Sequence, residues 1–175
     1  SDAGVEGAYR FLRRVWSFGH LFASEIRGQI GAQRQLAGDK LPEDLAAFRR
    51  EIHLLLKQAN YDLGKQQFNT VASATMKMLN AIEKAPRQGA LAAEVLEECF
   101  GILLRVLSPL TPHISHALWQ QLGYGDDILA AAWPEPLDAA LVQDEIELVL
   151  QVNGKLRGSL RVPADAAKDA IEAAA

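Results

Sequence analysis

Two histidines near the middle of the chain are the first residues whose spacing could support metal chemistry. His113 and His116 stand three positions apart, so in a helix their imidazoles lie on one side and could reach one metal ion. Cys99 falls inside an apolar repeat, and no carboxylate stands at a matching ligand spacing. We therefore expect the two histidines to pack and to form hydrogen bonds, and we predict no metal site.

The usual signatures of covalent catalysis and phosphate binding are missing from the sequence. It contains no Gly-x-Ser-x-Gly turn that would expose a nucleophilic serine. It also contains no glycine-rich loop that would hold a phosphate before a helix. Asp126 and Asp127 could bind a cation, but we interpret them as part of a solvated turn. We predict no catalytic residue in this chain.

A cluster of arginines near the N-terminus is a stronger candidate for binding. Arg10, Arg13 and Arg14 fall in one sector of an expected helix, beside Trp16. Guanidinium groups so arranged can hold phosphate oxygens through paired hydrogen bonds while the apolar side of the helix packs inward. The simpler alternative is a solvated charged face, in which Glu6 pairs with Arg10 four residues later.

A second basic cluster lies near the C-terminus. Lys155, Arg157 and Arg161 stand at alternate positions of an expected strand, so we expect them on one face. They could contact a polyanion, or they could only protect an exposed strand edge from pairing with another chain. The two roles fit these residues equally well.

The overall charge argues against a general nucleic-acid binder. The formal net charge of the 175 residues is −4. It is unevenly distributed, since residues 1–60 carry +2 and residues 61–175 carry −6. No lysine or arginine stands between Arg105 and Lys155. Because an acidic surface repels phosphate and releases no counterions, any polyanion contact must come from outside that stretch.

Composition and chain ends indicate a piece of a larger, cytoplasmic protein. Hydrophobic residues make up 49% and charged residues 23% of the chain, as in ordinary globular proteins. No apolar run approaches the roughly 20 residues of a membrane span, and a single cysteine fits a reducing compartment. The chain begins at Ser1 and stops within a helical pattern, so we expect it to be cut from something longer.

Apolar periodicity predicts about five helices in the first 125 residues, followed by a change of pattern. In each helical segment apolar residues recur every three or four positions. Proline and capping residues mark several of the expected starts. The segments are residues 4–27, a run from Pro42 that weakens at Gly64, a run from the cap Asn69-Thr70 to Pro86, residues 90–107, and a run from the cap Thr111 with Pro112 to Leu122.

The period then becomes 2, which predicts a β-hairpin. Residues 146–152 and 156–162 alternate apolar and polar positions on either side of an Asn-Gly pair. A two-residue loop would place Leu150 beside Arg157 and mix the faces. We therefore predict a three-residue loop, which pairs Leu150 with Leu156 and leaves one apolar face.

These elements describe a mainly α protein with the beginning of a second domain. We expect a helical domain over 1–125, an acidic linker over 126–145, and a partial ββα domain over 146–175. Because two strands alone are marginal in water, the hairpin and the helix after it are expected to open an α/β domain that is truncated here.

Several motifs resemble the bacterial-type leucyl-tRNA synthetases, a family of class I aminoacyl-tRNA synthetases. The opening helix of their anticodon-binding domain is similar to residues 4–16 (GVEGAYRFLRRVW). The helical domain shared by leucine, isoleucine and valine enzymes is similar to residues 68–70 (FNT), 107–114 (LSPLTPHI) and 117–119 (ALW). More specific to the leucine enzymes are residues 132–134 (AWP), 152–158 (VNGKLRG) and 162–166 (VPADA). The resemblance covers essentially the whole chain, in family order.

The resemblance implies that the parent joins leucine to its tRNA with ATP and Mg²⁺, and hydrolyses mischarged tRNA in a separate editing domain. The family's His-Ile-Gly-His and Lys-Met-Ser-Lys-Ser signatures are absent here. Neither reaction is therefore expected of this piece, which should need no cofactor of its own. Its implied partners are leucine tRNA and the remainder of its own synthetase chain, in a monomer.

The resemblance also assigns the basic clusters. The helix with Arg10, Arg13, Arg14 and Trp16 follows the catalytic core, where the inner side of the tRNA passes. The basic hairpin belongs to the domain that reaches the outer corner of the tRNA. Leucine tRNAs carry several anticodons, so the domain should grip the stem and shape of the tRNA more than it reads anticodon bases.

Three other interpretations stay open on the residues alone. An isoleucine- or valine-type synthetase domain is disfavoured by the hairpin motif. A helical protein-interaction module that binds no RNA fits the acidity and predicts an exposed apolar groove, whereas the synthetase interpretation predicts exposed arginines on the first helix. A metal-dependent helical hydrolase requires His113 and His116 to converge with a carboxylate.

Overall fold

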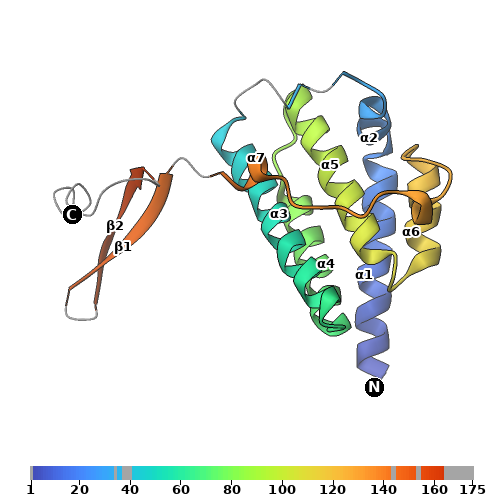
Figure 1. Ribbon diagram of the computed structural model, residues 1–175, viewed down its shortest axis with the longest axis horizontal. Helices are drawn as coiled ribbons and strands as arrows, with labels where there is room; N and C mark the ends of the chain where they lie inside the picture. Colours follow the sequence, from blue (N-terminus) through green and yellow to red (C-terminus); the bar gives the residue numbers. More distant parts are fainter. Residues whose placement is uncertain (1, 34, 37–40, 143–144, 153–154, 164–175) are drawn as a thin grey trace. The chain divides into compact units, whose positions relative to one another are not determined.

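The computed structural model describes residues 2–33, 35–36, 41–142, 145–152 and 155–163, and the chain divides into two compact units, 1–140 and 141–175 (Figure 1). The first unit is helical, and the second holds a two-stranded antiparallel hairpin. In chain order the elements are α1 (Asp2–Leu21), α2 (Ala23–Gln29), α3 (Glu43–Gly64), α4 (Phe68–Lys84), α5 (Ala90–Leu107), α6 (Pro112–Gln121), the 3-10 helix η1 (Ile128–Ala130), α7 (Asp138–Leu141), β1 (Glu145–Val152) and β2 (Lys155–Pro163).

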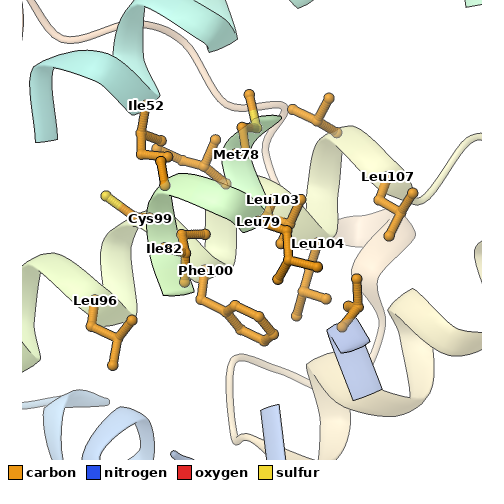
Figure 2. Packing of buried hydrophobic residues seen from close by; sticks show 14 of the residues in the cluster. Ile52, Met78, Leu79, Ile82, Leu96, Cys99, Phe100, Leu103, Leu104 and Leu107 are labelled. Atoms are coloured by element: carbon orange, nitrogen blue, oxygen red, sulfur yellow. The ribbon is translucent and has the colours of Figure 1, made fainter. Parts of the chain in front are cut away.

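Helix α5 forms the centre of the helical unit because its sequence is apolar on nearly every side. It packs against α2, α3, α4 and α6. Its fully buried Phe100 and Leu103 belong to the same core cluster as Ile52 of α3 and Leu79 of α4 (Figure 2). A helix that is apolar all round is stable only when it is surrounded, so the other helices arrange themselves about α5.

The first expected helix is divided at Phe22. α1 and α2 replace the single helix predicted over 4–27, and Phe22 between them has φ −106° and ψ 18°. The Phe22 N–H still donates to Phe18 O at 3.1 Å, and the Ile26 N–H donates to Phe22 O at 3.0 Å. The irregularity is therefore confined to one residue. It allows α2 to pack against α5, and Ile26 is fully buried.

The ends of α5 and α6 match the predicted punctuation. α5 spans the expected residues, and Pro112 lies in the first turn of α6. Thr111 occupies the N-cap position, but its side chain makes no capping hydrogen bond. Proline alone explains this start, because its fixed φ suits the first helical turn and its missing N–H would have no partner there.

The cap predicted at Asn69-Thr70 is wrong. α4 already begins at Phe68, and no side chain caps it. The preceding turn closes through the backbone: Gln66 adopts a positive φ of 59°, and the Gln67 N–H donates to a carbonyl at the end of α3 at 2.9 Å. Because this turn is so tight, the helix starts before the residues whose types favour capping.

The hairpin is present, but its predicted register is wrong. β1 and β2 pair Leu148 with Leu160 and Leu150 with Gly158, whereas the prediction paired Leu150 with Leu156. The paired positions therefore shift by two residues along β2. Away from the loop, apolar positions still oppose one another, as in the pairs Ile146 with Val162 and Leu148 with Leu160, which is the feature on which the prediction rested.

A β-bulge explains how the hairpin reaches this register. Val152 pairs with Lys155, so the two strands are joined by the short connection that the prediction rejected. The register then shifts between Leu150 and Gln151, where β2 carries one extra residue. That residue brings the apolar positions back into alignment. Residues 164–175, over which a helix was expected, lie outside the described residues.

An extended segment that we call the strap, residues 132–137, is fastened to the helices of the first unit (Figure 1). The acidic linker was expected over 126–145, but residues up to 140 belong to the helical unit. Side chains of α3 and α5 supply the fastening. The hydrogen bonds run from Arg105 to Ala132 O (3.1 Å), from Trp133 to Asn60 Oδ1 (2.9 Å), from Asn60 to Pro134 O (3.1 Å), and from the Leu137 N–H to His53 Nδ1 (3.1 Å).

Candidate nucleic-acid interface

The arginine cluster of α1 borders an open pocket on the helical unit, which we call the arginine pocket. It has a volume of about 590 Å³. Its polar lining consists mainly of Arg10, Arg13 and Arg14 of α1, Glu83 of α4, and Arg87 just beyond α4. The structure thus brings the three predicted arginines together and adds a fourth from a distant part of the sequence.

Arg14 has a structural partner. Its Nε and Nη2 atoms donate to the two oxygens of the Glu83 carboxylate at 3.1 and 2.5 Å. Nη2 also donates to Asn80 Oδ1 at 2.7 Å. The hydrogen bond with Glu83 raises the pKa of Arg14, against an opposing effect of burial. This fork joins α1 to α4, and it leaves Arg14 less able to bind a phosphate.

The Arg87 guanidinium lies over the aromatic rings of Phe18 and Phe22. Its guanidinium carbon is 4.2 Å from the ring centre of Phe22 and 5.1 Å from that of Phe18. Its Nη2 atom donates to Ile82 O at 3.1 Å and to Glu83 O at 2.8 Å. Burial lowers the pKa of Arg87, but a guanidinium keeps its charge in proteins. Sequence reasoning missed Arg87 because no local pattern links it to α1.

Arg10 and Arg13 differ from Arg14 and Arg87, which are held by hydrogen bonds. Both are exposed, and within the described part of the chain the structure assigns neither a hydrogen bond nor an ion pair. Because Glu83 is matched by Arg14, the lining keeps an excess of positive charge. Unpaired guanidinium groups of this kind bind phosphate oxygens through short, charge-assisted hydrogen bonds.

The structure does not place Trp16 in the pocket. Its ring packs against His20 with the ring centres 4.5 Å apart, and the side chain is 37% exposed. His20 Nδ1 lies 3.0 Å from Trp16 O. The two rings form a separate aromatic surface on α1, so a direct contribution of Trp16 to tRNA binding stays a prediction.

For the second basic cluster, in the hairpin, the structure describes only the backbone. Lys155, Arg157 and Arg161 all belong to β2, and the register places Arg161 opposite Glu147. Their side chains lie outside the described part of the structure. Their predicted contacts with tRNA therefore remain predictions.

The two histidines of α6 do not form a metal site in the described part of the chain. His113 is exposed, and His116 Nδ1 lies 3.6 Å from the carboxylate of Asp127. Among the described residues no three histidine, cysteine or acidic side chains gather in a way that could hold a metal ion. The hydrolase interpretation required such a group, and this part of the chain does not supply it.

A buried ionic cluster between α3 and α5 was missed by sequence reasoning. Arg49 donates to the two Glu98 oxygens at 2.7 and 2.9 Å, and His53 Nε2 lies 2.8 Å from Glu98 Oε1. Burial alone would raise the pKa of Glu98, but the hydrogen bonds from His53 and Arg49, with the charge of Arg49, lower it to about 2. Arg49 and His53 are 7% and 1% exposed, so the cluster is structural.

His53 also connects this cluster to the strap. Its Nδ1 atom accepts the Leu137 N–H at 3.1 Å. With Nδ1 as the acceptor, the Nε2 atom carries the proton that reaches Glu98. The buried cluster thus holds the C-terminal end of the strap.

The first unit is therefore a helical bundle with an open pocket lined by exposed arginines. None of the helices in the described part is long and apolar enough to cross a membrane.

The family described as the anticodon-binding domain of tRNA ligase matches residues 46–172. The chain belongs to this family.

Similar proteins agree with this assignment. The chain is 70% identical over 176 residues to a leucine–tRNA ligase of Azoarcus and 68% identical to that of Aromatoleum aromaticum. All of the chain is covered in both comparisons, but it spans only 20% of each relative's length. Among solved structures, the ternary complex of an Agrobacterium radiobacter LeuRS with tRNA and LeuAMS matches at a TM-score of 0.72 and 25% identity. That match covers 99% of this chain and 22% of the neighbour's chain.

Proposed function

We propose that this chain is the tRNA-binding part of a leucine–tRNA ligase. The parent joins leucine to its tRNA with ATP and Mg²⁺ in the cytoplasm, and this part positions the tRNA for the catalytic and editing domains. The observation that carries the proposal is the arginine pocket, in which Arg10 and Arg13 are exposed and have no partner among the described residues, while Arg14 is paired with Glu83. The names of the relatives and of the structural neighbour support leucine tRNA as the partner.

In the proposed mechanism, two helices held together by an ion pair present two exposed arginines to the RNA. The fork between Arg14 and Glu83 fixes α1 against α4. Arg10 and Arg13 then stand at set positions and neutralise neighbouring backbone phosphates, which releases counterions. Such contacts fix the orientation of an RNA without reading its sequence. This suits a domain that must accept leucine tRNAs with different anticodons.

A titration of the chain with two tRNAs tests this function. We expect salt-sensitive binding of leucine tRNA, and weaker binding of an unrelated tRNA that lacks a long variable arm. Equal binding of both would leave the chain as an RNA-positioning module without selectivity of its own. Absence of binding to either tRNA at low salt would refute the proposal and favour a protein-interaction module.

A further inference from the structure

The arginine pocket contains an apolar surface that phosphate binding does not use. Phe18 and Phe22 line it, and Leu21 lines it while remaining 73% exposed to solvent. Phe22 is only partly buried. A ligand consisting of phosphate alone would contact Arg10 and Arg13 and leave these apolar side chains in water. The lining therefore suits a ligand that joins an anionic group to a flat apolar one.

Arg87 adds a flat surface to this pocket. Its guanidinium carbon lies over the Phe22 ring, 4.2 Å from the ring centre. Its two hydrogen bonds to carbonyls at the end of α4 hold it in place. Arg87 is nevertheless exposed and lines the pocket. Unstacked RNA bases commonly lie against such guanidinium planes and against aromatic side chains.

We propose that the arginine pocket binds one unstacked nucleotide of an RNA, with its base against Leu21 and Arg87 and its phosphate at Arg10 and Arg13. This inference rests on the proposed function, because it names the part of an RNA that the pocket takes. The pocket volume of about 590 Å³ falls within the range of small-molecule sites. The excess of positive charge favours an anionic ligand over an apolar peptide, since four arginines and one acidic residue line the pocket.

A nucleotide site of this kind should prefer an RNA with a bulged, unstacked base over an RNA in which every base is paired. A paired base must be unpaired and unstacked before it can enter, which costs free energy that a bulged base does not require. Contacts of the phosphate with Arg10 and Arg13 are available to both kinds of RNA. Only the bulged RNA gains the contacts of the base.

The test uses all 175 residues and compares two hairpin RNAs that differ by one bulged 2-aminopurine. We expect the bulged hairpin to bind about fivefold more tightly, the lower end of what stacking of one base contributes. We also expect the 2-aminopurine fluorescence to change on binding. In Leu21→Ala the ratio of the affinities for the bulged and the paired hairpin should fall toward one. Binding of the paired hairpin should not weaken, because Leu21 is exposed and carries no charge.

Two further variants separate this inference from loss of folding. Leu129→Ala removes an equally exposed leucine outside the pocket (79% exposed) and should keep the full preference. Arg87→Lys keeps the charge but removes the guanidinium plane, so it should reduce the preference. Equal binding of the two hairpins by the unaltered chain would overturn the nucleotide site and leave the proposed function standing. Failure to bind either hairpin at low salt would overturn both.

Discussion

Arginines on neighbouring turns of α1 have different roles because only one of them meets an acidic residue of α4. Arg14 reaches Glu83 and Asn80, whereas Arg10 and Arg13 have no such partner in the described structure. The sequence predicts the cluster, because the three residues share a helical sector. It cannot predict this division, since Glu83 is brought close only by the packing of α4 on α1.

This division predicts separate effects on stability and binding. Arg14→Ala should lower the free energy of unfolding by about 0.5–1 kcal/mol, because it removes a two-pronged bridge that is partly exposed. Arg13→Ala, the matched control, should leave that free energy unchanged. Urea unfolding followed by circular dichroism measures both. An equal loss in the two variants would show that Arg14 has no special role between the helices.

The buried cluster around Glu98 predicts a dependence of stability on pH. The pKa of Glu98 is lowered from 4.5 to about 2 in the folded chain. The ionised Glu98 carboxylate therefore stabilises the fold above pH 4.5. This contribution, on the order of 3 kcal/mol, is lost as the pH falls from about 4.5 to about 2. In Glu98→Gln the fall in unfolding free energy over this range should be smaller. The same pH dependence in variant and unaltered chain would contradict the assignment.

A close approach between α5 and the turn after α6 explains where glycine is required. A Cβ atom at Gly101 of α5 would lie 2.9 Å from the Tyr124 ring. That ring stacks on Trp119, and its hydroxyl donates to Glu97 O at 2.6 Å, so it cannot move away easily. By contrast, nothing lies within 4 Å of a Cβ placed at Gly7 of α1.

These two glycines form a matched pair for mutation. Gly101→Ala should lower the free energy of unfolding by about 1–2 kcal/mol, because overpacking outweighs the gain in helix propensity. Gly7→Ala should be neutral or should raise it by up to about 1 kcal/mol. Thermal unfolding of the two variants measures the difference. A stabilising Gly101→Ala would mean that the tyrosine ring is not fixed.

The strap is held at Trp133 and Pro134 by the side chain of Asn60. Asn60 accepts from Trp133 Nε1 and donates to Pro134 O, so Asn60→Ala should loosen the strap at Trp133 and Pro134 while its C-terminal end stays held by His53. We expect faster hydrogen exchange of the Trp133 indole N–H and a red shift of its fluorescence. Asn69→Ala, on exposed α4 surface, should change neither. An unchanged indole signal in Asn60→Ala would place the fastening elsewhere.

Helices with continuous apolar stripes could be predicted from the sequence, and the details set by tertiary contacts could not. The bounds of α5 follow from its own residues. The break at Phe22 and the start of α4 depend on packing against α5 and on a tight backbone turn. Likewise, the hairpin was predictable from alternation, but a bulge of one residue decides which positions pair.

For the whole molecule, the candidate site joins parts of the chain that are distant in sequence. α1 supplies Arg10 and Arg13, and the turn after α4 supplies Arg87. The matched family range, 46–172, excludes the arginines of α1. The relatives at 70% and 68% identity cover them, since they match all of the chain. The arginine pocket exists only in the folded bundle, because its lining comes from α1, α4 and the turn after α4.

A salt titration of tRNA binding by the unaltered chain and by the double variant Arg10→Gln/Arg13→Gln shows whether the arginine pocket binds RNA. Both residues are exposed and unpartnered in the described structure, so the variant should fold normally. If these arginines neutralise two phosphates, the slope of log Kobs against log salt should decrease in magnitude by about 2, together with a loss of affinity. An unchanged slope and affinity would contradict the claim that the arginine pocket binds RNA.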